Sequence, residues 1–188
     1  QEGYKMSFEQ PKPDSKKYSD LISEIQKGII KIPKFQREFV WSIEKTAGLL
    51  DSILKGYPIG TFILWQTSER INDIKNVGNI DIPDTPEGTK VQYVLDGQQR
   101  ITSLYAAYLG AEIQKVGEKK ITDYSNIYVN LDGDIEVNDE QVITAEPIGE
   151  KYLSLHDVLS FSYSKAKELS DRFSEDELET INSYSTAF

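Results

Sequence analysis

The sequence contains no cysteine and a single histidine, His156. The absence of cysteine excludes disulfides, zinc–thiolate sites and cysteine nucleophiles. A single histidine excludes a metal site with two histidine ligands, and a Ser–His–Asp mechanism would have to use that residue. No apolar run reaches the roughly 18 residues that a membrane span needs, and no secretory signal opens the chain. We therefore expect a cytoplasmic protein without membrane association.

Positive charge is also scarce, because 31 acidic residues outnumber 21 lysines and arginines and give a net charge of −10. Residues 1–60 hold 10 basic and 8 acidic residues, whereas residues 61–188 hold 11 and 23. Duplex DNA binding requires many phosphates to be neutralised. This composition disfavours a surface that binds DNA uniformly. It leaves either an ordinary solvated surface or a polyanion site confined to the N-terminal third.

A chain of 188 residues is long enough for one self-sufficient domain. The polar residues 1–17, with Pro11 and Pro13, are typical of an arm. We assign residues 18–160 to the domain and residues 161–188 to the start of a helical extension. Because no stop signal precedes Phe188, we expect a fragment of a longer protein.

Apolar spacing predicts a mixture of helices and strands. The clearest helix spans 98–109, ends at Gly110 and directly follows an apolar strand at 91–95. Residues 67–89 are polar and rich in Asn, Asp, Gly and Pro, which favours a mobile loop or insertion. Further helices are expected at 19–27, 43–55, 155–159 and beyond 163, with caps at Ser19, Ser42, Ser154 and Ser174, and further strands at 29–32, at 60–65 and in a hairpin turning at 132–134.

The most informative segment, VLDGQQR at 94–100, runs from the apolar strand through Asp-Gly into the helix. Such a junction leaves the first N–H groups of the helix unpaired, and together with the helix dipole they favour an anion. Gly97 allows a ligand to approach the backbone closely, and Gln98 and Gln99 add neutral hydrogen-bond donors. The junction therefore predicts an anion site.

Two charged residues flank this junction. Arg100 can hold phosphate as a two-pronged fork, and Asp96 can hold Mg²⁺ through water or orient an attacking water. The alternative is purely structural: Asp96 caps the helix, Gly97 makes the turn, and Arg100 pairs with a surface acid. Spacing alone leaves both interpretations open.

Two other segments could contribute to such a site. In IPKFQREFVW at 32–41, aromatic residues flank Gln36, Arg37 and Glu38, so Arg37 and the Gln36 amide either face an anion or simply face water while the aromatics pack. In GYPIGT at 56–61, a loop with Pro58, Ile59 and Gly60 could supply a backbone wall without bulky side chains. Alone, this loop is a weak signal.

Three strings, FQREFVW at 35–41, DSILKGYPIG at 51–60 and DGQQRITSL at 96–104, occur in this order. Together they closely resemble the N-terminal domain of GmrSD-type, modification-dependent restriction enzymes, a domain also found in the phosphorothioate-sensing defence protein SspE. The resemblance is strongest over residues 20–110. Ile101 stands where the family often has leucine, and Ser103 where it often has a second threonine.

The resemblance implies an α+β fold similar to ParB and sulfiredoxin: a small mixed sheet with surrounding helices. It further implies hydrolysis of an NTP, often GTP or UTP, that regulates a nuclease in defence against phage. That nuclease is commonly an HNH-type domain near the C-terminus. Since an HNH motif needs several histidines, any such domain would lie beyond this chain.

The leading hypothesis is a Mg²⁺-dependent NTPase domain, with phosphates at the start of the 98–109 helix. One alternative is a non-catalytic sensor of modified DNA or of nucleotide, and another is a ParB-like domain that nicks DNA. The expected catalytic residues are Asp96, Gln98 and Arg100, with Asp96 also as the metal ligand. The expected nucleotide-binding residues are Gln36, Arg37, Pro58, Ile59, Gly60, Gly97, Gln99 and Thr102.

Overall fold

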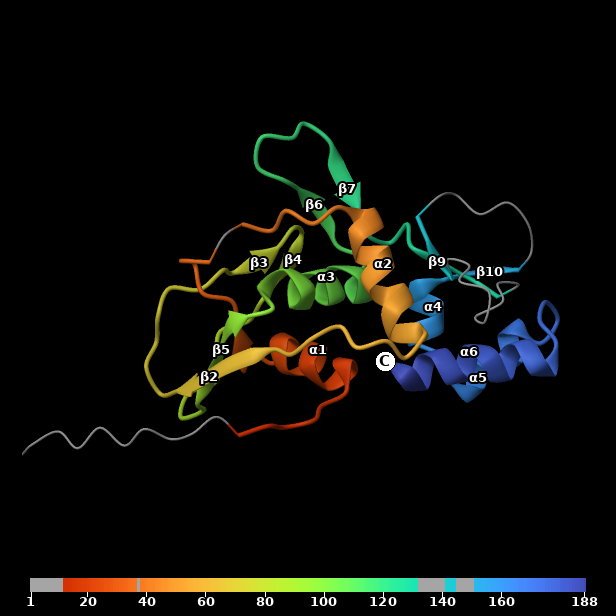
Figure 1. Ribbon diagram of the computed structural model, residues 1–188, viewed down its shortest axis with the longest axis horizontal. Coiled ribbons are helices and arrows are strands. Elements are labelled where there is room, and N and C mark those ends of the chain that lie inside the picture. Colours follow the sequence, from red (N-terminus) through yellow and green to blue (C-terminus); the bar gives the residue numbers. More distant parts are fainter. Residues whose placement is uncertain (1–11, 37, 132–140, 145–150) are drawn as a thin grey trace, which may run out of the picture.

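The computed structural model describes residues 12–36, 38–131, 141–144 and 151–188. These parts form an α+β arrangement of helices around small sheets, as expected (Figure 1). The predicted Arg37, the turn at 132–134 and most of the N-terminal arm lie outside the described residues. Within the described part of the chain, no helix has both the length and the apolar character needed to cross a membrane.

The helices begin largely where the sequence places their caps. The side chains of Ser42, Ser154 and Ser174 each accept a hydrogen bond from a backbone N–H three residues later. The cap predicted at Ser19 is wrong, because that helix already begins at Tyr18 and Lys17 occupies the cap position. The helices are α1 (Tyr18–Gln26), α2 (Ile43–Leu54), α3 (Gln98–Leu109), α4 (Leu155–Leu159), α5 (Tyr163–Leu169) and α6 (Glu175–Ala187).

A three-stranded sheet carries the junction of interest. Its order is β1 (Ile30–Lys31), β5 (Val91–Asp96) and β2 (Ile63–Thr67). β5 pairs in parallel with β1 and antiparallel with β2, which makes the sheet mixed, as predicted. β5 is the central strand: β1 pairs with its first half, at Gln92 and Tyr93, whereas β2 runs beside it as far as Asp96.

The remaining strands are short. One sheet has the order β10 (Tyr152–Ser154), β8 (Tyr128–Asn130) and β9 (Val142–Ile143). Two hairpins are formed by β3 (Asn76–Val77) with β4 (Ile80–Asp81), and by β6 (Glu112–Gln114) with β7 (Ile121–Asp123). The first hairpin corrects the prediction of a loop at 67–89, because Val77 and Ile82 are buried in the core. Two-residue strands are too short to show periodicity in sequence.

α3 is the centre of the hydrophobic core and packs against α1, α2 and α4 (Figure 1). Nine of its residues are buried, including Ile101 and Leu104, and burying each such aliphatic side chain stabilises the fold by about 1.5–3 kcal/mol. Residues 161–188, expected to begin an extension, add Ile181 and Tyr184 of α6 to the same core. The ring of Phe188 stacks on Tyr108 of α3, with centroids 5.8 Å apart. α3 and the DGQQR motif at 96–100, whose last three residues open this helix, are thus firmly placed.

Candidate functional site

The predicted strand–glycine–helix junction is present: β5 ends at Asp96 and α3 begins at Gln98. Gly97 has a φ of +88°, and a Cβ there would lie 2.6 Å from the ring of Phe62. Any other residue would be strained and would displace that ring. No side chain caps α3, so the structural alternative in which Asp96 caps the helix is wrong. The first N–H groups of α3 therefore lack a side-chain acceptor among the described residues.

Arg100 is bound by the 56–61 loop. Its Nη1 donates to the carbonyl oxygen of Ile59 at 2.5 Å, and its Nη2 donates to that of Thr61 at 2.8 Å. A Cβ on the intervening Gly60 would overlap Nη1. The Nη2 atom also lies 3.5 Å from Oδ2 of Asp96, whose side chain is 64% exposed. Arg100 thus fixes the loop onto α3 and brings its charge next to the junction.

Gln99 is a clamp for the 32–41 segment. Its Nε2 donates to the carbonyl oxygen of Glu38, and its Oε1 accepts the backbone N–H of Val40, both at 2.9 Å. The side chain is 5% exposed. Because both ends of the amide are engaged by backbone groups, Gln99 positions this segment and has no acceptor left unpaired.

Gln36 holds the same segment against the sheet. Its Nε2 donates to the carbonyl oxygens of Val94 and Leu95, at 3.1 and 3.2 Å. These carbonyls are the last before the motif, so Gln36 lies directly beside the junction. The hydrogen bonds of Gln36 and Gln99 thereby hold residues 36 and 38–40 beside the junction of β5 and α3, some sixty residues later in the chain.

These contacts enclose a cavity of about 170 Å³ at the junction. Gln36 and five consecutive motif residues line it, as the sequence predicts, and Trp41 joins them although the sequence indicated it only as a flanking aromatic. Of the other expected residues, Ile59 and Gly60 contact Arg100 rather than the cavity, and Pro58 is exposed outside its lining. The lining residues are Gln36, Trp41, Asp96, Gly97, Gln98, Gln99 and Arg100.

A second cleft, of about 490 Å³, adjoins this cavity and shares Gln36 and Gln98 with it. The expected residue Thr102 lies in this cleft, one helical turn after Gln98. No sequence signal pointed to most of its walls, which come from the β3–β4 hairpin and from β6 with the residues after it. The lining residues are Lys34, Gln36, Glu38, Phe39, Ile74, Asn76, Val77, Gly78, Gln98, Thr102, Ile113, Gln114, Lys115 and Val116.

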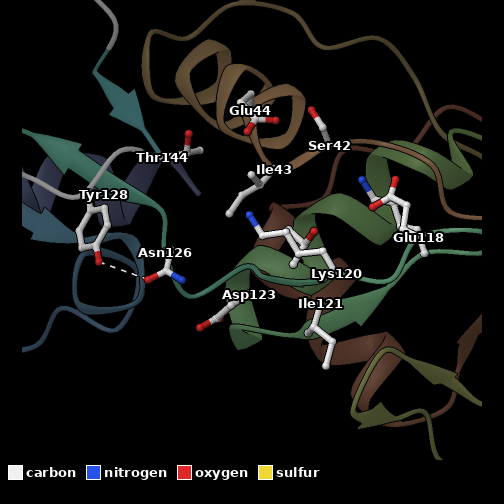
Figure 2. A pocket seen from close by; sticks show the side chains of 12 residues that line it. Ser42, Ile43, Glu44, Glu118, Lys120, Ile121, Asp123, Asn126, Tyr128 and Thr144 are labelled. Atoms are coloured by element: carbon white, nitrogen blue, oxygen red, sulfur yellow. Dashed lines mark hydrogen bonds between the residues drawn. The ribbon is translucent and has the colours of Figure 1, made fainter.

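A larger hollow of about 730 Å³ lies elsewhere, between the start of α2 and the β6–β7 hairpin (Figure 2). Glu44, Lys120 and Asp123 mix both signs of charge there, and Asn126 contacts the hydroxyl of Tyr128. A hydrogen bond with Ser42 is the main cause that lowers the pKa of Glu44. This hollow contains no residue of the motif and no expected site residue.

Asp96 is the one carboxylate among the described residues that line the junction cavity. Among the described residues, no group of three or more His, Cys, Asp or Glu side chains is placed to hold a metal ion. Mg²⁺ at nucleotide sites keeps several waters and binds one or two carboxylates together with substrate phosphates. One exposed carboxylate beside the cavity fits an ion that arrives bound to phosphates.

The chain is similar in sequence to a described protein family and to an individual protein. A family model described as the N-terminal domain of the GmrSD restriction endonuclease matches residues 18–187, which include α5 and α6. The uncharacterized protein MJ0686 of Methanocaldococcus jannaschii is 32% identical over 99 residues. The aligned region covers 50% of this chain but only 17% of that protein.

Proposed function

The chain belongs to the family of GmrSD restriction endonuclease N-terminal domains, and from this premise we propose that it is the nucleotide-binding, NTP-hydrolysing regulatory domain of a DNA restriction system. The observation that carries the proposal is the junction of β5 and α3. There the uncapped start of a helix, a glycine turn and an arginine surround one cavity. Backbone N–H groups in such a place suit phosphate oxygens.

Phosphate binding follows from the charges at this junction. The start of a helix carries about half a positive charge, and no carboxylate in the described part of the chain caps α3. Arg100 adds a full charge at the same place, held by two carbonyl oxygens with its side chain 19% exposed. A guanidinium has five N–H donors, so donors remain for a phosphate.

Hydrolysis requires a water to attack the terminal phosphorus. The water oxygen bonds to that phosphorus, the bond to the bridging oxygen breaks, and the water proton passes to the solvent or to a carboxylate. Asp96 lies at the cavity and accepts a hydrogen bond from the attacking water. The start of α3 and Arg100 stabilise the negative charge that grows on the phosphate oxygens. Mg²⁺ would be held through water by Asp96 and would neutralise phosphate charge.

The test is phosphate release from GTP, UTP, ATP and CTP with Mg²⁺. We expect wild type to hydrolyse at least one of them, and Asp96→Asn and Arg100→Lys to be slower by about 100-fold or more. Asp171→Asn, which changes an exposed acid outside the site, is the matched control and should retain the wild-type rate. Equal rates in all four proteins would contradict the catalytic assignment.

One observation favours a second function, a sensor that binds nucleotide without hydrolysing it. Two donors of Arg100 are engaged by the carbonyl oxygens of Ile59 and Thr61, which reduces what it offers a transition state. Saturable NTP binding without phosphate release would support this function. In either case the bound state would be relayed to a nuclease domain, commonly of the HNH type, and modified DNA would be contacted by the full-length protein.

A further inference from the structure

Two buried polar atoms in the second cleft have no hydrogen-bond partner among the described residues: Oε1 of Gln98 and Oγ1 of Thr102. Their side chains line the cleft, and the residues are only 7% and 1% exposed. An unsatisfied buried polar group costs about 1–3 kcal/mol. Since buried polar groups are nearly always paired, two such groups one helical turn apart indicate a missing partner.

Neighbouring polar groups of the same types are satisfied. The hydroxyl of Thr46 is also buried, but it donates to the carbonyl oxygen of Ser42 at 3.1 Å and contacts Oγ of Ser103 at 3.2 Å. The adjacent amide, Gln99, has partners at both ends. Among the described residues, two other buried side-chain atoms lack a hydrogen-bond partner, Nζ of Lys31 and Oδ2 of Asp73, but these form an ion pair at 3.1 Å. Gln98 and Thr102 have no such compensation within that part of the chain.

The rest of the cleft suits a flat, partly apolar ligand. Phe39, Val77, Ile113 and Val116 provide apolar wall, while the amide and hydroxyl lie together on one side. A nucleobase has two apolar faces and an edge that alternates hydrogen-bond donors and acceptors. An amide with an adjacent hydroxyl is complementary to such an edge. A cleft for phosphate alone would have no need of the apolar wall.

The cleft also lies where the base would reach. Gln36 and Gln98 border both this cleft and the junction cavity, so a ligand with its phosphates at Gly97 passes directly into the cleft. Resting on the proposed function, we propose that the cleft binds the nucleobase of the nucleotide, and that the Gln98 amide and the Thr102 hydroxyl read the edge of the base. This assigns Gln98 to ligand recognition rather than to the reaction.

The test separates recognition of the base from binding of the phosphates. Calorimetry would compare the Mg²⁺ complexes of GTP, UTP, ATP and CTP with that of inorganic tripolyphosphate, which has no base. We expect wild type to bind the preferred NTP roughly tenfold or more tightly than tripolyphosphate, and to discriminate among the four bases. Thr102→Val and Gln98→Met should each reduce that preference by about tenfold. Thr102→Val should also leave tripolyphosphate binding unchanged, because Thr102 does not line the junction cavity.

Thr46→Val is the matched control, because it removes a buried threonine hydroxyl outside the cleft and should preserve the preference among bases. The inference is overturned if wild type binds all four NTPs and tripolyphosphate alike, or if Thr102→Val and Gln98→Met both keep the wild-type preference. If tripolyphosphate still binds in that case, only the inference about the base fails, and the proposed phosphate site is retained. Failure of every polyphosphate to bind overturns the proposed function and this inference together.

Discussion

The guanidinium of Arg100 occupies the space that a side chain on Gly60 would need. The two residues are forty positions apart, and they meet because Arg100 donates to the carbonyl oxygens on either side of Gly60. The loop and the helix start are therefore one unit. A change at either residue should alter both the loop and the cavity beside it.

Gly60→Ala should destabilise the protein more than Gly56→Ala does. Both glycines have a positive φ, of +87° and +70°, so alanine is strained at either position. A Cβ on Gly56 meets nothing within 4 Å, whereas a Cβ on Gly60 would displace the guanidinium of Arg100. We expect an additional loss of about 1–3 kcal/mol for Gly60→Ala, measured from urea unfolding midpoints. Equal losses would mean that the loop is not held by Arg100.

Gln99→Leu should release residues 38–40 from α3. The substitution removes the acceptor of the Val40 N–H and the donor to the Glu38 carbonyl, so amide hydrogen exchange at Val40 should accelerate by about tenfold or more. Gln99→Glu keeps that acceptor and loses only the donor, so Val40 should stay more protected in it. Unchanged exchange in Gln99→Leu would contradict the role of Gln99 as a clamp.

Local signals in the sequence correctly predicted where several helices begin and end. Ser42 and Ser154 stand directly before apolar helical patterns and Ser174 stands before an acidic first turn, and each of the three caps a helix in the structure. Gly97 and Gly110 bound α3, and both adopt the left-handed conformation that favours glycine. Such features depend on a few neighbouring residues, so one sequence is enough to show them.

Thr102→Val should stabilise the ligand-free protein, because it removes a buried hydroxyl without a partner and keeps the side-chain shape. We expect the free energy of unfolding to rise by about 1 kcal/mol, which corresponds to about 2–4 °C in melting temperature. Thr46→Val should have the opposite effect and lower stability by about 1 kcal/mol, since its hydroxyl is paired. A destabilised Thr102→Val variant would show that the hydroxyl is satisfied in the folded protein.

Acid should weaken the attachment of α6 through Glu177. A hydrogen bond from Lys151, followed by one from the Ser174 backbone, lowers the pKa of Glu177 from 4.5 to about 2. Because this pKa is lower in the folded than in the unfolded protein, the contribution is complete above about pH 4.5 and is lost as the pH falls toward 2. Glu177→Gln should flatten the stability profile over that range.

The control for this pH dependence is Glu179→Gln, which changes an exposed acid on the same helix. That variant should keep the wild-type dependence of stability on pH between 4.5 and 2. If Glu177→Gln and wild type lose the same stability over that range, the pair with Lys151 does not contribute.

Contacts across long stretches of sequence were not predictable in the same way. Gln98, Gln99 and Arg100 are adjacent and were all expected to donate to an anion, the glutamines as neutral donors and Arg100 as a charged fork, yet the structure gives them different environments. Gln99 is engaged by a segment sixty residues earlier, Arg100 by another loop, and Gln98 is left with an unpaired oxygen. Their partners are backbone groups, which carry no side-chain signature in the sequence. The neighbouring cleft likewise depends on the β3–β4 hairpin, whose short strands were not recognised.

The central claim is that nucleotide phosphates bind at the start of α3, and backbone amide chemical shifts test it most directly. In a titration of the full chain with Mg²⁺ and NTP, we predict saturable shifts of the Gly97, Gln98 and Gln99 N–H resonances, and the same shifts with Mg²⁺ and tripolyphosphate. Resonances around the hollow at Glu44 and Lys120 should stay in place. Saturable shifts confined to that hollow, with the Gly97 resonance unmoved, would contradict the claim.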